Sequence, residues 1–310
     1  MKQISNHLLM IEPVSFSKNA QTAVNNYYQK DSVLSPLETQ EQALNEFKNF
    51  AALLQGKGIE VTVVRDTIDP ETPDSIFPNN WISFHEDSRV GIYPMFAENR
   101  RNEVRFEILE ELKTKGYQIG DIVDFRKESS EVFLEGTGSI VLDRANRVAY
   151  CALSPRADRE LFNRFCTEFS FKAMVFHAYQ NVGTSRELIY HTNVMMCVGD
   201  AYVIICLDCV DDVVEKNSLI EQFKKDGKEI ITVSEEQVNS FAGNMLQVQN
   251  QSGDKFLVMS KAAHDSLSEE QVNRIERFNP ILSSDLNTIE TCGGGSARCM
   301  MAEVFLPKIS

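Results

Sequence analysis

The sequence predicts an α/β protein in which five similar units follow one another along the chain. Apolar runs rich in β-branched residues alternate with more polar, helix-like stretches from end to end. The helix-like stretches begin at residues 36, 98, 157, 211 and 268, so their starts lie 62, 59, 54 and 57 residues apart, close to one fifth of the 310-residue chain. Such a period is typical of radial or solenoid arrays, although an ordinary α/β protein can show it by chance.

The individual elements follow from local patterns. Short apolar runs bounded by polar or turn-forming residues predict strands at 7–13, 59–66, 79–85, 89–95, 121–125, 138–143, 147–153, 172–179, 193–199, 201–210, 229–234, 244–250, 255–260 and 302–307. Longer stretches of mixed polarity predict helices at 36–54, 98–115, 157–167, 211–225 and 268–278. The last of these opens on Ser268 followed by acidic residues, which is typical of a helix N-cap.

The composition restricts the class of protein. Lys and Arg number 31 against 45 Asp and Glu, which gives a formal net charge of −14. Nucleic acids and anionic membranes are bound by neutralising phosphates, so this balance argues against both partners. Hydrophobic residues make up 43% and charged residues 25%, as in an ordinary soluble globular protein. No linker-like segment divides the chain, and we expect one domain over 1–310.

The N-terminal sequence and the cysteines indicate the cellular location of the protein. Only four apolar residues, 8–11, follow one another near the start, too few for a signal peptide, and no run is long enough for a membrane span. The seven cysteines are scattered and odd in number, which suits free thiols in a reducing compartment. We therefore expect a cytoplasmic protein, although a processed secreted chain would also lack a signal.

Five polar residues recur near the predicted strand ends at almost one interval. They are Asn80, Glu135, His191, Asn244 and Cys299, separated by 55, 56, 53 and 55 residues. If each has the same place in its unit, the five side chains meet near one pseudo-symmetry axis. A carboxylate, an imidazole, a thiol and two amides would then share one pocket.

Cys299 is the candidate nucleophile. It follows three glycines at 293–295, which let the backbone approach a ligand closely. Arg298 and the loop amides would favour the thiolate, the form in which cysteine is nucleophilic. Cys292 is the alternative nucleophile. We interpret the other cysteines as core residues. The Cys-x-x-Cys at 206–209 has the spacing of half a zinc site but lacks a second pair, and a thiol-based redox or zinc protein that uses Cys206 and Cys209 is a further alternative.

His191 and Glu135 are the candidate proton-transfer groups. A histidine at a strand start can equally be structural, and a carboxylate at a strand end can simply accept from backbone amides. The apolar residues 132–134 before Glu135 predict a desolvated carboxylate with a raised pKa, a property useful for proton transfer. The repeat of polar residues favours the catalytic interpretation of both.

These motifs resemble those of the guanidine-modifying enzymes, the pentein superfamily of arginine deiminases, dimethylarginine hydrolases and amidinotransferases. Residues 134–136 resemble its (I/L)-E-G-G-D stretch, 191–193 its H-x-D, 295–300 its G-G-P-R-C-M loop and 77–80 its F-x-R-D, in the family's order. The resemblance implies a five-bladed α/β propeller of ββαβ modules. It also implies that Cys299, His191 and Glu135 are catalytic and that Phe77, Asn80 and Asn193 bind the substrate. The repeat of polar residues adds Asn244 to the substrate-binding residues, and Arg298 is added as a candidate partner of a substrate carboxylate.

The departures from the family pattern concern the substrate. Deiminases hold a cationic guanidinium with carboxylates, whereas the matching positions here are Asn80 and Asn193. An amide both donates and accepts, so it can bind a neutral ureido group. The segments at 77–81, 134–139, 190–193 and 290–300 resemble the citrulline-utilisation hydrolase branch over nearly the whole chain.

The resemblance implies hydrolysis of a ureido C–N bond of citrulline or a similar amino acid, through a covalent Cys299 intermediate, to ornithine, ammonia and carbon dioxide. The amides at 293–296 and Asn193 are candidate donors to the ureido oxygen, and Arg186 or Arg298 to an α-carboxylate. No metal or other cofactor is called for, and a homodimer is allowed. The alternatives are a deiminase, methylarginine hydrolase or amidinotransferase acting on a guanidino group and using Asp200 or Glu131, and a non-catalytic pentein binding module.

Overall fold

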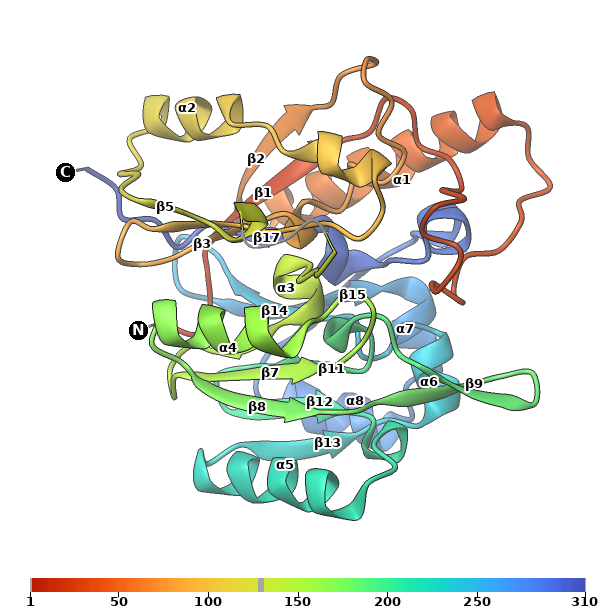
Figure 1. The fold of residues 1–310 in the computed structure, drawn as a ribbon, viewed down its shortest axis with the longest axis vertical. Coiled ribbons are helices and arrows are strands. Elements are labelled where there is room, and N and C mark those ends of the chain that lie inside the picture. Colours follow the sequence, from red (N-terminus) through yellow and green to blue (C-terminus); the bar gives the residue numbers. More distant parts are fainter. Residues whose placement is uncertain (1, 128–130, 310) are drawn as a thin grey trace.

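The chain forms a mixed α/β fold in a computed structural model that describes residues 2–127 and 131–309 (Figure 1). Within these residues, five three-stranded sheets share one pattern, in which the middle strand pairs antiparallel with one neighbour and parallel with the other. The sheets are β3 (Ile82–Phe84), β4 (Val90–Ile92) and β5 (Ile122–Asp124); β6 (Val141–Asp143), β7 (Val148–Ala152) and β8 (Lys172–Phe176); β11 (Met196–Val198), β12 (Tyr202–Ile205) and β13 (Glu229–Thr232); β14 (Leu246–Gln249), β15 (Lys255–Ser260) and β16 (Ile281–Ser284); and β17 (Ala302–Glu303), β1 (His7–Glu12) and β2 (Glu60–Arg65).

Helices connect the two parallel strands of each sheet. The helices of the described chain are α1 (Pro36–Gly56), α2 (Glu107–Thr114), α3 (Gly136–Ser139), α4 (Arg159–Glu168), α5 (Val213–Lys225), α6 (Glu235–Asn239), α7 (Lys261–Ser266) and α8 (Glu269–Glu276). A parallel pair requires such a crossover, and α1, α2, α4 and α5 lie toward the outside of the molecule (Figure 1). The predicted period of about one fifth of the chain therefore corresponds to a strand–strand–helix–strand unit. One unit combines both ends of the described chain, because β17 pairs with β1.

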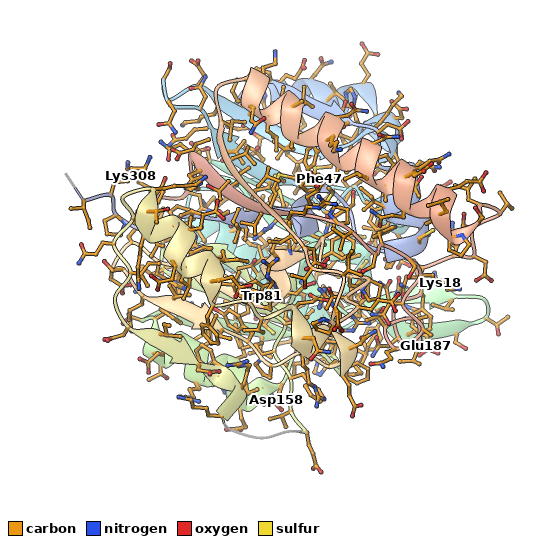
Figure 2. All side chains as sticks on the ribbon, turned by 90° about the horizontal axis from the view of Figure 1, so that it is seen from above. Lys18, Phe47, Trp81, Asp158, Glu187 and Lys308 are labelled. Atoms are coloured by element: carbon orange, nitrogen blue, oxygen red, sulfur yellow. The ribbon has the colours of Figure 1, made fainter. Side chains whose placement is uncertain are left out.

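The hydrophobic core fills the space between each sheet and its helix. Helix α5, for example, buries Leu219 and Phe223 against a cluster that includes Ile204 of β12. Figure 2 shows the side chains that fill this interior, with Phe47 and Trp81 inside and Lys18, Glu187 and Lys308 at the periphery. No helix among the described residues is long and apolar enough to cross a membrane.

Several predicted elements differ from the structure. The helix predicted at 98–115 is a short 3-10 helix, η2 (Asn99–Glu103), followed by α2, because Val104 is extended and separates them. The hairpin of β9 (Tyr179–Val182) and β10 (Ser185–Leu188), which projects from the body in Figure 1, was not predicted. Strand β16 was missed too. Each predicted strand contains a strand of the structure, and Ser268 caps α8 as predicted.

Candidate active site

The five recurring polar residues lie at corresponding places in the five sheets. Each comes shortly before the first strand of its sheet: Asn80 before β3, Glu135 before β6, His191 before β11, Asn244 before β14 and Cys299 before β17. Four of them stand on or beside short helical turns, namely η1 (Pro78–Asn80), α3, η4 (Thr192–Val194) and η7 (Ala297–Met300). All five side chains are at least 97% buried. The structure brings them together in one region.

Glu135 and His191 form the charged part of this region. The Glu135 Oε2 atom lies 2.7 Å from His191 Nε2, and Oε1 accepts from the Phe96 backbone N–H at 2.9 Å. Burial alone would raise the pKa of Glu135, but the guanidinium of Arg156 and the His191 hydrogen bond lower that pKa well below its ordinary value. Burial lowers the pKa of His191 to about 4 against the opposing effect of Glu135. The resting pair is therefore a carboxylate and a neutral imidazole whose Nε2 carries the proton, so the raised pKa predicted for Glu135 is wrong.

Asn80 is held in one orientation by Arg100. The Arg100 Nη1 atom donates to Asn80 Oδ1 at 2.9 Å, and the same guanidinium forms two hydrogen bonds with Glu103. Because Oδ1 faces a cation, the amide nitrogen must face the other way. That Nδ2 atom is buried and has no hydrogen-bond partner among the described residues. A Cβ atom on Gly138 would lie 2.3 Å from Asn80 Nδ2 and 2.8 Å from His191 Nδ1, so only glycine leaves both groups in place.

Two amides surround the Cys299 sulfur. Asn244 Nδ2 lies 3.2 Å from Sγ, and Asn193 Nδ2 lies 3.6 Å from it. His191 forms no hydrogen bond or ion pair with Cys299 within the described part of the chain. The sulfur is therefore held by neutral N–H donors.

A small cavity adjoins three of these groups, Asn80, His191 and Cys299. It is lined by Asn26, Asp74, Phe77, Asn80, Arg100, Arg156, Tyr190, His191, residues 293–295 and Cys299, and its volume of about 10 Å³ has room for about one water molecule. The Phe77 ring packs against the glycines, since a Cβ on Gly293 or Gly295 would lie 2.8 or 3.0 Å from it. Gly294 has a φ of 62°, and Asn26 donates to its carbonyl at 3.2 Å. The three consecutive glycines thus permit close contacts on both sides of the loop.

The segment at 13–34, between β1 and α1, covers the cavity. Asn26 and Gln29 from this covering segment donate to the carbonyls of 292–294. Thr22 accepts at its carbonyl from Arg156 at 2.8 Å, and Asn19 donates to Asp74 at 2.8 Å. Hydrogen bonds thus tie the covering segment to the glycine loop, to Arg156 and to Asp74.

Three charged residues of the cavity were not identified from the sequence. Arg156 Nη1 lies 3.5 Å from Glu135, and its guanidinium stacks 4.8 Å from the centre of the Tyr190 ring. Arg100 is the group that orients Asn80. Asp74 is 2% exposed, burial raises its pKa, and its Oδ1 has no partner among the described residues. The sequence signals that could have indicated them are weak. Asp74 lies three residues before Phe77, and Arg156 follows a predicted strand.

Other candidates lie elsewhere. The Arg298 guanidinium points away from the cavity, where it donates to the Met301 carbonyl at 2.7 Å and pairs with Glu303 at 3.1 Å. Arg186 pairs with Asp211 and Glu235 beside the projecting hairpin. Neither is therefore in position to bind a substrate carboxylate. Cys292 also lies outside the residues that line the cavity.

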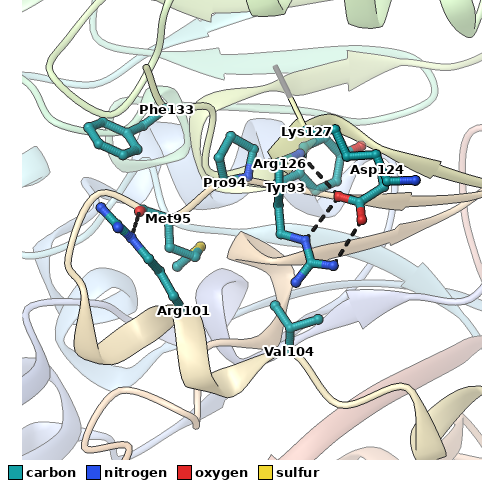
Figure 3. Close-up of a pocket in the computed structure, with 9 residues that line it drawn as sticks. All are labelled: Tyr93, Pro94, Met95, Arg101, Val104, Asp124, Arg126, Lys127 and Phe133. Atoms are coloured by element: carbon teal, nitrogen blue, oxygen red, sulfur yellow. Dashed lines mark hydrogen bonds and ion pairs between the residues drawn. The ribbon is translucent and has the colours of Figure 1, made fainter. Parts of the chain in front are cut away.

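Neither a metal site nor a larger cavity of the described chain includes the five recurring polar residues. No group of three or more His, Cys, Asp or Glu side chains in the described chain could hold a metal ion. A cavity of about 470 Å³ adjoins Pro94 and Met95 (Figure 3). In it, Arg126 pairs with Asp124 at 2.8 Å, and Arg101 donates to the Met95 carbonyl at 3.2 Å. None of the five recurring polar residues lines this larger cavity.

The comparisons with known proteins agree with the fold. ArgZ, an arginine dihydrolase from the ornithine-ammonia cycle in cyanobacteria, is 16% identical, with a TM-score of 0.74 over 98% of this chain and 41% of the ArgZ chain. The chain therefore spans about two fifths of that relative. A mutant of DDAH from Pseudomonas aeruginosa, complexed with citrulline, is also 16% identical, with a TM-score of 0.64 over 96% of this chain and 99% of that one. No curated protein sequence matches significantly.

The match to a family model identifies the protein family to which the chain belongs. The model described as N,N dimethylarginine dimethylhydrolase, eukaryotic, matches residues 12–306. The chain belongs to this family and, with it, to the pentein superfamily of guanidine-modifying enzymes. The description of the matching family is that of a hydrolase of a guanidino compound. The predicted superfamily is confirmed.

Proposed function

We propose that this enzyme hydrolyses the ureido group of citrulline or a similar amino acid to ornithine, ammonia and carbon dioxide. The observation that carries the proposal is the fixed amide of Asn80. Arg100 occupies its oxygen at 2.9 Å, and this leaves a buried N–H₂ group without a partner among the described residues. A ureido oxygen needs such a donor, whereas a guanidinium has only N–H groups and needs acceptors. An unpaired buried donor is costly, so the matching acceptor is favoured.

The amino-acid end of the substrate has its own candidate partners. Arg156 is a buried cation suited to a carboxylate, and the unpartnered Asp74 Oδ1 is suited to an ammonium group. Both residues line the cavity from which the Cys299 sulfur is reached. Arg186 and Arg298, the carboxylate partners predicted from the sequence, are engaged with other residues outside the cavity. An α-amino acid with a neutral head group therefore fits the chemistry of the cavity.

The reaction proceeds through a covalent intermediate. The thiol proton passes to His191, the Cys299 sulfur attacks the ureido carbon, and a C–S bond forms. The bond from that carbon to the side-chain nitrogen breaks, and the nitrogen keeps the electron pair and takes the proton from His191. Ornithine leaves, and a carbamoyl group stays on the sulfur.

The second half regenerates the thiol. Water attacks the carbamoyl carbon while His191 takes a proton from the water. The C–S electron pair returns to the sulfur, and His191 passes that proton to the sulfur. The released carbamate decomposes to ammonia and carbon dioxide. Throughout, the Glu135 carboxylate holds the imidazole by its 2.7 Å contact and stabilises the imidazolium that forms. Asn80 and Asn193 stabilise charge on the ureido oxygen.

A second candidate is hydrolysis of a guanidino group, as in arginine or a methylated arginine. The matching family model supports it, as does the name of ArgZ. The buried charges around the cavity also favour a cation, because the three carboxylates Asp74, Glu103 and Glu135 face the two guanidinium groups of Arg100 and Arg156. The two candidates share the fold and the thiol chemistry but differ in the head group.

Some broader expectations belong to the same proposal. We infer that the five sheets close around one axis as a five-bladed propeller and that 1–310 acts as a single catalytic domain. The shared sheet pattern and the family model over 12–306 support both. A cytoplasmic location and a possible homodimer stay predictions, as do the absence of a cofactor and of a nucleic-acid or membrane partner.

The test is ammonia release from citrulline, arginine, dimethylarginine, agmatine and ureidopropionate, with Cys299→Ala as the blank. Citrulline turnover that disappears in Cys299→Ala supports the proposal. Turnover of arginine or dimethylarginine alone selects the second candidate. Full activity of Cys299→Ala would overturn the nucleophile assignment, and a folded protein that is silent on every compound would overturn both candidates.

A further inference from the structure

Every hydrogen-bonding atom of the Asn244 amide is engaged. The Oδ1 atom accepts from the Arg298 backbone N–H at 3.0 Å, while Nδ2 lies 3.0 Å from the Asn193 carbonyl and 3.2 Å from Cys299 Sγ. An amide nitrogen has two hydrogens, so one is directed at the carbonyl and the other at the sulfur. No N–H is left for a substrate, and the substrate-binding role predicted for Asn244 does not fit this geometry.

The backbone around Asn244 fixes this arrangement. A Cβ atom on Gly243 would lie 2.3 Å from the Val194 carbonyl oxygen and 2.6 Å from the Met195 carbonyl carbon. Glycine therefore lets this strand entry lie directly against the turn that carries Asn193. Asn244 is fully buried and its own N–H donates to the Phe241 carbonyl at 2.8 Å. The amide is thus positioned before any substrate arrives.

The other groups around the sulfur do not replace it. Many thiol enzymes stabilise the thiolate with an imidazolium, but His191 is directed at Glu135 and burial keeps it neutral at ordinary pH. The Asn193 amide is farther from Sγ, at 3.6 Å. The Arg298 guanidinium is directed away, toward Glu303. Asn244 is therefore the nearest described donor to the sulfur.

We propose that Asn244 is a catalytic residue that stabilises the Cys299 thiolate through the Nδ2–H···S hydrogen bond. The inference rests on the proposed function only in that Cys299 is the nucleophile, and it holds for a ureido or a guanidino substrate. The same N–H stabilises negative charge on the sulfur at two steps, first when the thiol gives up its proton and again when the C–S electron pair returns to the sulfur. Arg298 contributes through its backbone N–H, which orients the amide.

The decisive variant is Asn244→Asp, which keeps the shape and the bond from Arg298 but directs an oxygen at the sulfur. We expect the pH profile of Cys299 alkylation by iodoacetamide, followed on the peptide that carries Cys299, to move upward by about 1 to 2 pH units, since hydrogen bonds to charged groups have that strength. Asn244→Ala should move it in the same direction by a smaller amount. Turnover of the best substrate should fall about 10²-fold, mainly in kcat.

Controls separate this role from folding and from the proposed function. Asn279→Ala is matched, because Asn279 is also a buried amide, accepting from Tyr202 and Gln247, and does not contact the sulfur. It should leave the alkylation profile unchanged. An Asn244→Asp profile that coincides with the wild-type profile, in a folded variant, would overturn the inference. Because alkylation needs no substrate, failure of the citrulline assay would leave this result interpretable.

Discussion

The substitution Asn80→Asp tests the argument for a ureido substrate most directly. In the structure, Arg100 Nη1 donates to Asn80 Oδ1 at 2.9 Å, so a carboxylate at this position would keep that contact and meet a cation at once. The fold is therefore expected to hold. The other end of the side chain changes. There, a carboxylate oxygen, which accepts hydrogen bonds, replaces the amide nitrogen, which donates them.

The size of the effect follows from the donor that is lost. Removal of one donor to a developing oxyanion costs about 10²- to 10³-fold in kcat, so citrulline turnover should fall by that factor. A guanidinium gains a hydrogen bond to a charged group, worth about 1.5 to 3 kcal/mol, or about 10- to 150-fold. The ratio of kcat/KM for citrulline over arginine should therefore fall by about 10³-fold or more.

The assay is steady-state ammonia release with both substrates, and Asn80→Ala separates loss of the donor from gain of the charge. Asn80→Ala should lower citrulline turnover without improving that of arginine. If Asn80→Asp left the ratio within about threefold of the wild-type value, the assignment of Asn80 to the head group would be refuted. A wild-type enzyme that already prefers arginine would refute it sooner.

Three further changes test other contacts. Gly138→Ala should cut kcat by about 10²-fold by displacing Asn80 and His191, whereas Gly56→Ala, with open space around its Cα, should leave kcat unchanged in the same assay. Arg156→Lys should raise KM about 10-fold or more by weakening the bond to the α-carboxylate, and an unchanged KM would contradict that role. Burial raises the pKa of Glu290 to about 7, so the folded protein keeps a proton that the unfolded chain releases near pH 4.5, and stability is lost as the pH rises from there to 7. Glu290→Gln should therefore gain up to about 3 kcal/mol relative to wild type between pH 5 and pH 8 in urea unfolding, and a constant difference would disprove the burial effect.

The sequence predicted those features that repeat. Five residues at nearly equal intervals came together because each precedes the first strand of a sheet with the same pattern, so one position in the repeat corresponds to one place in space. Ser268 was predicted to cap its helix because capping depends on neighbours three residues away. Local and periodic information was sufficient for both.

The features that the sequence did not predict depend on contacts between segments that are far apart along the chain. Arg100 and Arg156 lie in connections after strands, and their roles arise only where the covering segment and the neighbouring sheets meet them. Arg298 was expected in the cavity because it adjoins Cys299, yet adjacent residues in the η7 turn point to different sides. The break of the predicted helix at Val104 likewise has no local signal as strong as proline or glycine.

The division of the site among five units explains how such an enzyme can change its substrate and keep its fold. The decisive hydrogen bonds cross between units: Glu135 to His191, and Asn244 to both Asn193 and Cys299. Each unit supplies its side chain from the segment just before the first strand of its sheet, and the sheets beneath are packed by other residues. An Asp or Asn at one turn therefore alters the charge offered to the head group without disturbing a core. For this reason the identity of residue 80, rather than the fold, is the feature on which the choice between a ureido and a guanidino substrate should depend.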